Sequence, residues 1–119
     1  MKLLVDAILP ETVVTEAPPG VEVLRWSEGD VSDEDLLRAG ARQGARGVVF
    51  LDRRSLYQPG LREVAAQLGV ALVAVEVNDP VEAKERLFQN LDHVRNALTM
   101  SEAVLVLAHE ARPIPSSSG

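Results

Sequence analysis

The chain has 119 residues, of which 46% are hydrophobic and only 3% aromatic, so we expect one globular domain with an aliphatic core. Acidic residues outnumber basic residues by 18 to 12, and the net charge of -6 gives no overall attraction to nucleic acid or anionic lipid. Cysteine is absent, which excludes disulfides, thiol catalysis and thiolate metal sites.

Strand and helix signals alternate from the start of the chain. Residues 2–6 form an apolar run closed by Asp6, which predicts a buried strand with a carboxylate at its end. A helix is expected over residues 7–17, with Pro10 suited to its first turn. Residues 21–26 alternate in polarity for most of their length, and they predict a second strand nearer the edge of the sheet.

The middle of the chain contains the clearest pattern. Ser32 is the expected N-cap of a helix that Gly44 ends. Three acids fill the first turn of that helix: Asp33, Glu34 and Asp35. Residues 48–51 are continuously apolar and too short for a helix, which predicts a central strand covered on both faces. Asp52 follows that strand, and residues 53–59 read as a polar loop.

The last third of the chain repeats the alternation. Helical spacing predicts a helix over residues 61–68, and a nearly continuous apolar run predicts a strand over residues 70–77. One long helix is expected over residues 80–98, beginning at an Asp-Pro pair. A fifth strand is expected at residues 103–108, with residues 111–114 folding back as a short antiparallel edge.

This order predicts a three-layer α/β/α sandwich with a mostly parallel sheet of about five strands. Residues 1–115 would form the single domain, and residues 116–119 a disordered tail. Right-handed crossovers place the carboxyl ends of the parallel strands at one edge of the sheet. The acids Asp6, Asp33 and Asp52 would therefore meet at that edge, where open parallel sheets build their sites.

Carboxylates that converge on one point suit a hard cation such as Mg²⁺ or Mn²⁺, and Asp6, Asp33, Asp52 and Glu34 are the candidate ligands. Each of these acids also has a possible structural role that involves no metal. Aspartates at strand ends hydrogen-bond loop amides, and acids after an N-cap are favoured by the helix dipole. Mg²⁺ needs as few as one or two protein carboxylates, so the set is lean but sufficient.

Other polar and aromatic residues carry weaker signals. Arg53 and Arg54 would contact RNA phosphates or offset the charge of Asp52, and a solvated loop is the alternative. No partner with metal-ligand spacing accompanies either histidine, so His93 and His109 are expected on the surface. Trp26 has two interpretations, base stacking or core packing. Phosphate-cradling glycine motifs and a nucleophile elbow are absent from the sequence.

Several segments, in order and spacing, resemble the short PIN-like domains, toxin-like proteins related to the RNase module of some exonuclease-like proteins. These segments are residues 2–6 with Pro10, 32–37, 48–54, 79–80 and 112–115. The resemblance implies a metal-dependent endoribonuclease, often in toxin–antitoxin settings, with Asp6, Asp33 and Asp52 as its acidic site. It also implies RNA and an antitoxin-like protein as partners.

The chain departs from the family pattern at the expected site. Ala7 and Ile8 stand where family members commonly carry Glu and Asn, Phe50 replaces a threonine, and Arg54 replaces an acid. Two hypotheses follow, an active ribonuclease with a partly degenerate site and a catalytically inactive module that binds or assembles proteins. No apolar run is long enough to span a membrane, so we expect a soluble cytoplasmic protein. We also expect a homodimer, because small sandwiches with apolar edge elements often dimerise.

Overall fold

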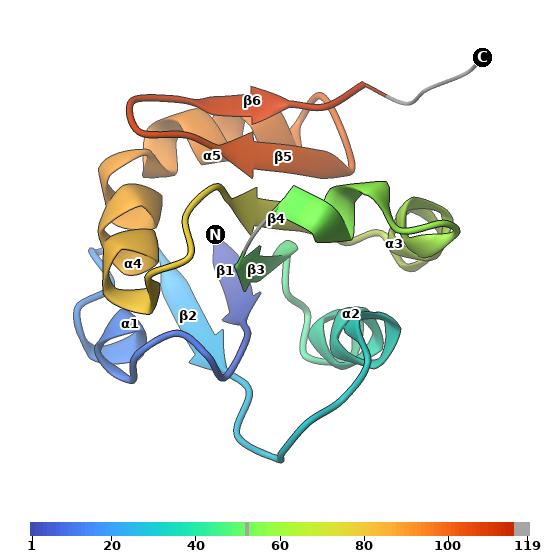
Figure 1. Ribbon diagram of the computed structural model, residues 1–119, viewed down its shortest axis with the longest axis horizontal. Helices are drawn as coiled ribbons and strands as arrows, with labels where there is room; N and C mark the ends of the chain where they lie inside the picture. The colour runs from blue at the N-terminus through green and yellow to red at the C-terminus, as the bar shows by residue number, and fades with distance from the viewer. Residues whose placement is uncertain (52, 116–119) are drawn as a thin grey trace.

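Figure 1 shows the computed structural model, which describes residues 1–51 and 53–115. Its centre is a six-stranded sheet with the strand order β2-β1-β3-β4-β5-β6. The strands are β1 (Lys2–Val5), β2 (Glu22–Arg25), β3 (Gly47–Leu51), β4 (Ala71–Val75), β5 (Ala103–Val106) and β6 (Ala111–Pro113). The first five strands are parallel, and β6 pairs with β5 antiparallel. The predicted sandwich class and its antiparallel edge are therefore confirmed.

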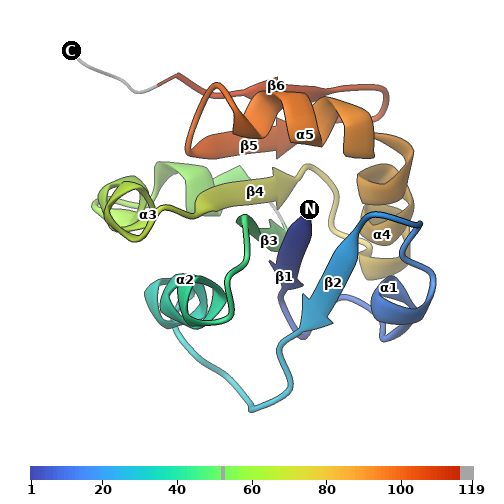
Figure 2. The same cartoon turned by 180° about the vertical axis from the view of Figure 1, so that it is seen from behind.

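Helices cover both faces of this sheet (Figures 1 and 2). The helical elements are α1 (Thr12–Thr15), α2 (Asp33–Arg42), the 3₁₀ helix η1 (Arg53–Tyr57), α3 (Leu61–Leu68), α4 (Pro80–Gln89) and α5 (Leu91–Leu98). Buried side chains of α1, α4 and α5 pack on one face, and those of α2, η1 and α3 pack on the other. Within the described part of the chain, no helix is long and apolar enough to cross a membrane.

The order β2-β1-β3-β4-β5 is the strand order of flavodoxin-like doubly wound sheets, although α4 and α5 here cover the same face as α1. In this arrangement the chain direction across the sheet reverses between β1 and β3. Loops that leave these two strands diverge to opposite faces, so a crevice opens at their carboxyl ends. Asp6 stands at one side of that crevice, directly after β1.

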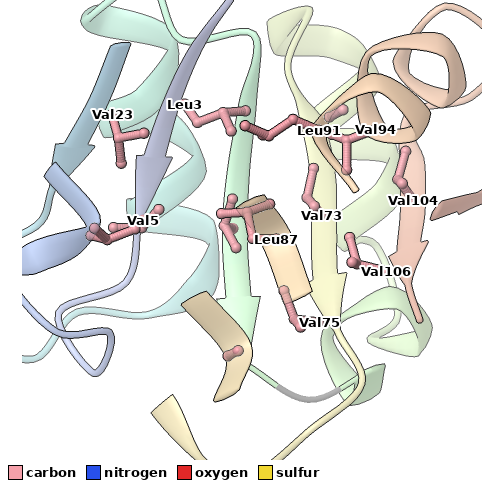
Figure 3. Packing of buried hydrophobic residues seen from close by; sticks show 14 of the residues in the cluster. Leu3, Val5, Val23, Val73, Val75, Leu87, Leu91, Val94, Val104 and Val106 are labelled. Carbon is pink, nitrogen blue, oxygen red and sulfur yellow. The ribbon is translucent and has the colours of Figure 1, made fainter. Parts of the chain in front are cut away.

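Successive side chains of each strand point to opposite faces of the sheet, so the core consists of two layers. Leu3 and Val5 of β1 face the layer beneath α1, α4 and α5, whereas Leu4 faces α2 and α3. Figure 3 shows the first of these layers, in which Leu87 of α4 and Val94 of α5 join valines of the sheet such as Val73. Residues two apart on a strand share one face, so Asp6 lies on the same face as Leu4, which α2 covers.

α2 lies unusually close to β3. A Cβ added at Gly40 would come within 2.6 Å of Val48 Cγ2, so only glycine permits this approach. The helix begins as predicted, because the Ser32 side chain accepts a hydrogen bond from the Asp35 amide at 3.1 Å. Gly44 follows the helix with a positive φ of 76°, a conformation that side chains disfavour. The close packing of α2 on β3, together with the Ser32 cap and Gly44 at its two ends, fixes the position of the helix and therefore of Asp33.

The predicted helix over residues 7–17 is wrong in its first half, because only Thr12–Thr15 is helical. Residues 6–9 form a turn in which the Leu9 amide donates to the Asp6 carbonyl at 3.0 Å. The Arg25 guanidinium then donates to the carbonyls of Ala7 and Leu9 at 2.6 and 2.7 Å. In this turn, a side chain from β2 binds these carbonyls in place of helical amides.

Two further predictions need correction. The segment expected as a loop at residues 53–59 contains η1, whose Leu56 is buried against the sheet. The helix expected over residues 80–98 is broken at Asn90 into α4 and α5. Neither proline nor glycine marks that break. The observed strands are also shorter than predicted by one or two residues at some ends, for example in β4.

Candidate functional site

The candidate site lies at the carboxyl ends of β1 and β3, where α2 begins. The backbone continues the strand pairing one residue past β1, because the Asp6 amide donates to the Val49 carbonyl at 3.1 Å. The Asp6 carboxylate then accepts a hydrogen bond from the Ile8 amide at 3.3 Å through Oδ1. Asp6 is half-buried, and the loop that carries it is held by Arg25.

Asp33 comes to the same place from the first turn of α2. Its Oδ2 accepts a hydrogen bond from the Gln58 side-chain amide at 3.0 Å. Burial raises the pKa of the Asp33 carboxyl, the Gln58 hydrogen bond opposes this rise, and the negative charge of Asp6 adds to it. The influence of Asp6 on the Asp33 pKa means that the two carboxylates lie near each other, as the sequence predicted.

Two oxygens at this edge remain available to a ligand. Within residues 1–51 and 53–115, Asp6 Oδ2 and Asp33 Oδ1 accept no hydrogen bond, and neither side chain forms an ion pair. Both are hard oxygen donors of the type that Mg²⁺ and Mn²⁺ prefer. The pair fits one weakly held divalent ion, because Mg²⁺ often binds through one or two carboxylates.

A full three-acid metal site is not present in the described part of the chain, which holds no group of three or more acidic, histidine or cysteine side chains able to bind a metal ion. Asp52, the third predicted ligand, lies outside the described residues. Glu34, the fourth, is exposed and contacts Arg38 one helical turn away, at 3.4 Å. No described contact joins Glu34 to Asp6 or Asp33.

The two predicted RNA-binding arginines occupy different places. Arg53 forms an ion pair with Glu76, just beyond β4, with 2.8 Å between Nη1 and Oε1. Exposed pairs of this kind contribute about 0–1 kcal/mol to stability, so Arg53 can exchange partners readily. Arg54 lines a pocket of about 270 Å³ beside Asp33.

That pocket contains two residues to which sequence reasoning assigned no function, Ser55 and Gln58. Ser55 is 6% exposed, and its Oγ has no hydrogen-bond partner among the described residues. A buried hydroxyl without a partner costs about 1–3 kcal/mol. No sequence pattern indicated these two residues, because residues 53–59 read as a polar loop and Gln58 lies just after the 3₁₀ helix η1.

Other polar and aromatic candidates lie away from this edge or serve the fold. His93 and His109 are exposed, as predicted. Trp26 packs against the core beneath α2 and donates through Nε1 to the Gly29 carbonyl at 2.8 Å. Tyr57 is 64% exposed on η1 and borders a second hollow of about 660 Å³, whose Arg62 is bound to Glu102 at 2.8 Å.

Comparisons with protein-family models, with curated proteins and with solved structures found no match for this chain. The PIN-like resemblance therefore stays a prediction drawn from the order of its segments.

Proposed function

We propose that the protein is a metal-dependent endoribonuclease whose divalent ion is held by Asp6 and Asp33. The observation that supports this proposal is the pair of half-buried carboxylates at the β1/β3 switch point, without an ion pair in the described residues. Their mutual repulsion and partial burial are costs that a bound cation would offset. RNA as the substrate comes from the PIN-like resemblance of the ordered segments.

A bound Mg²⁺ or Mn²⁺ would supply positive charge to the phosphoryl oxygens of the substrate. Asp6 and Asp33 would hold the ion, and Gln58 holds the Asp33 carboxylate through its hydrogen bond. Arg25 keeps the Asp6 loop in place through its two carbonyl contacts. Asp52 enters this proposal as a third ligand, and Arg53 and Arg54 enter it as contacts to RNA phosphates, from the sequence pattern alone.

A calorimetric Mn²⁺ titration in metal-free buffer tests the proposal directly. The unsubstituted protein is expected to bind Mn²⁺, and both Asp6→Asn and Asp33→Asn are expected to weaken binding at least about tenfold, since each removes a charged ligand. Glu34→Gln is the matched control, because Glu34 contacts Arg38 one helical turn away and its substitution should leave the affinity unchanged.

Ribonuclease activity is then measured on single-stranded RNA with the same set of variants. Cleavage that requires Mn²⁺ and is lost in Asp6→Asn and Asp33→Asn, but kept in Glu34→Gln, would support the proposal. If the Asp6→Asn variant still cleaves RNA, the activity would be assigned to a contaminating nuclease. Failure of the unsubstituted protein to bind Mn²⁺ would rule out this site.

A second candidate function, a catalytically inactive module that binds a protein, has its own support. Arg54 lines the pocket at a position where family members commonly carry an acid. Two aliphatic side chains are also exposed in the loops at this edge, Ile8 at 53% and Val31 at 39%. The predicted homodimer would use such a surface, whereas the antitoxin-like partner belongs to the ribonuclease proposal. Sedimentation of the unsubstituted protein and of the double variant Ile8→Ser/Val31→Ser distinguishes a dimer through this surface from a monomer.

A further inference from the structure

The hollow beside Tyr57 lies at a part of the sheet that has a helix on only one face. α5 lies behind β5 and β6 in Figure 1 and in front of them in Figure 2, and no α-helix of the described chain crosses β6 on the opposite side. The hollow is bordered by η1, α3 and the residues after β6, and its volume of about 660 Å³ is typical of a binding site. This side of the sheet therefore has room for a segment of another molecule.

Much of the lining of this hollow is apolar or aromatic. Ile114 is partly buried against the core layer beneath α2 and α3, and Ala66 is an exposed residue of α3 with a short side chain. Leu56 contributes from η1, and the neighbouring Tyr57 is 64% exposed. An aromatic ring combines a large apolar area with a negative face, so this lining suits a ligand that is both aliphatic and positively charged.

The charges in the lining are not balanced. Arg62 forms an ion pair with Glu102, with 2.8 Å between Nη2 and Oε1. Its guanidinium also donates to the carbonyls of Ile114 and Pro115, at 2.6 and 3.1 Å. Glu63, the next residue of α3, is exposed and makes no ion pair or side-chain hydrogen bond within the described part of the chain. The Glu63 carboxylate is therefore the charge of this lining that lacks a cation.

We propose that this hollow binds a basic segment of a partner protein. A lysine or arginine side chain of that segment would lay its methylene groups on Ala66 and Ile114. Its charge would lie between the Glu63 carboxylate and the Tyr57 ring, whose face attracts cations. The net charge of -6 also favours a basic partner. Residues 116–119 are three serines and a glycine, so they contain no side chain of this kind. No metal ion takes part, and the inference is independent of the proposed cation site.

An NMR titration of the isotope-labelled protein tests the inference. The probe is a short peptide, acetylated and amidated at its ends, in which leucine and lysine alternate. Its addition is expected to shift the amide signals of the residues that line the hollow, among them Tyr57, Glu63 and Ile114. A second peptide carries Nε-acetyl-lysine in place of lysine, which removes the charge and keeps the methylene groups. We expect it to bind about fivefold more weakly, since ionic and cation–π contacts at exposed sites are modest.

Three variants separate the charge from the shape of the hollow. Glu63→Gln is expected to weaken binding of the lysine peptide about fivefold and to leave binding of the acetylated peptide unchanged. Glu85→Gln is the matched control, because Glu85 is also exposed and has no ion pair in the described chain, but it lies on α4, on the other face of the sheet. Ala66→Gln fills the hollow at an exposed helical position without a change of charge. It should weaken binding of both peptides and leave the Tm unchanged.

Four results would overturn the inference. Equal binding of the two peptides would remove the positive charge from recognition, and equal losses in Glu63→Gln and Glu85→Gln would assign binding to the general negative charge of the protein. Shifts confined to other parts of the chain, or no binding at all, would show that the hollow does not take a basic segment. A dimer that sedimentation detects in the unsubstituted protein and not in Ala66→Gln would make a second copy of this chain the occupant.

Discussion

At the scale of single residues, three neighbouring features of the structure shift the pKa of the Asp33 carboxyl. Burial raises its pKa above the ordinary value of 3.8, the Gln58 hydrogen bond opposes the rise, and the charge of Asp6 adds to it. The folded protein therefore holds the Asp33 proton more tightly than the unfolded chain does. Protonation of Asp33 stabilises the fold below its ordinary pKa, and this contribution is lost as the pH rises through the raised pKa.

The pH dependence of the Tm checks this reasoning with Asp33→Asn, which cannot ionise and keeps an oxygen for Gln58. The Tm of the unsubstituted protein relative to this variant is expected to fall as the pH rises from about 3 and to level off before neutrality. Asp35→Asn, exposed in the same turn of α2, controls for the loss of a charge at a helix start. A difference that stays flat across this range would contradict the interpretation.

At neutral pH the half-buried, ionised Asp33 carboxylate lies near the charge of Asp6, which lowers the stability of the fold. Bound Mn²⁺ should offset this loss, because a cation between Asp6 and Asp33 attracts both carboxylates. An ion present at about 100 times its dissociation constant stabilises the folded state by about 2.7 kcal/mol. The Tm of the unsubstituted protein is expected to rise with Mn²⁺, and that of Asp33→Asn to rise much less. Equal increases would place the ion elsewhere on the molecule.

At the scale of elements, Asn90 decides how α4 and α5 meet. It is 2% exposed, and its side-chain amide donates to the Arg86 carbonyl at 2.8 Å and to the Leu107 carbonyl at 3.2 Å. A third contact reaches the Ala108 carbonyl at 3.4 Å. These bonds fasten the break between two helices to the turn that leads from β5 into β6, so the final hairpin depends on the break.

Replacing Asn90 tests this linkage. Asn90→Ala leaves these buried carbonyls without their donor, and it is expected to lower the free energy of unfolding by about 1–3 kcal/mol. Asn96→Ala is the matched control, because Asn96 is exposed on α5 and its side chain makes no hydrogen bond within the described chain. Denaturant unfolding measures both, and equal small effects would show that the hairpin does not need the amide.

At the scale of the whole molecule, the net charge of -6 opposes binding to RNA through general electrostatic attraction. Any affinity for RNA must then arise locally, from a bound cation and from arginines near the site such as Arg54. Binding should consequently depend on the divalent ion rather than on a broad basic surface.

Fluorescence anisotropy with a labelled single-stranded RNA checks this dependence. RNA binding by the unsubstituted protein is expected to require Mn²⁺ and to be lost when EDTA is added. Arg54→Gln should weaken it about tenfold, as for one lost charged contact, whereas Arg38→Gln should not, because Arg38 contacts Glu34 on the outer face of α2. RNA binding that survives EDTA would contradict a cation-mediated interface.

Much of the fold followed from local patterns. Apolar runs located the five parallel strands, Ser32 and the acids after it located the start of α2, and the antiparallel β6 was expected beside β5. The proximity of Asp6 and Asp33 also followed, because the carboxyl ends of parallel strands lie at one edge of the sheet. Such features depend on periodicity and capping, which a sequence displays within a few residues.

The amino-acid sequence by itself thus determined the sandwich class, the core residues of each strand and the acids at the strand ends. Only the tertiary structure decided the shortened α1, the break at Asn90 and the pocket that contains Ser55 and Gln58. In each case a side chain meets, or fails to meet, a partner from a distant segment. Arg25 binds carbonyls of the Asp6 loop, and Asn90 binds those after β5. No local pattern encodes such encounters, because they arise only when the layers have packed together.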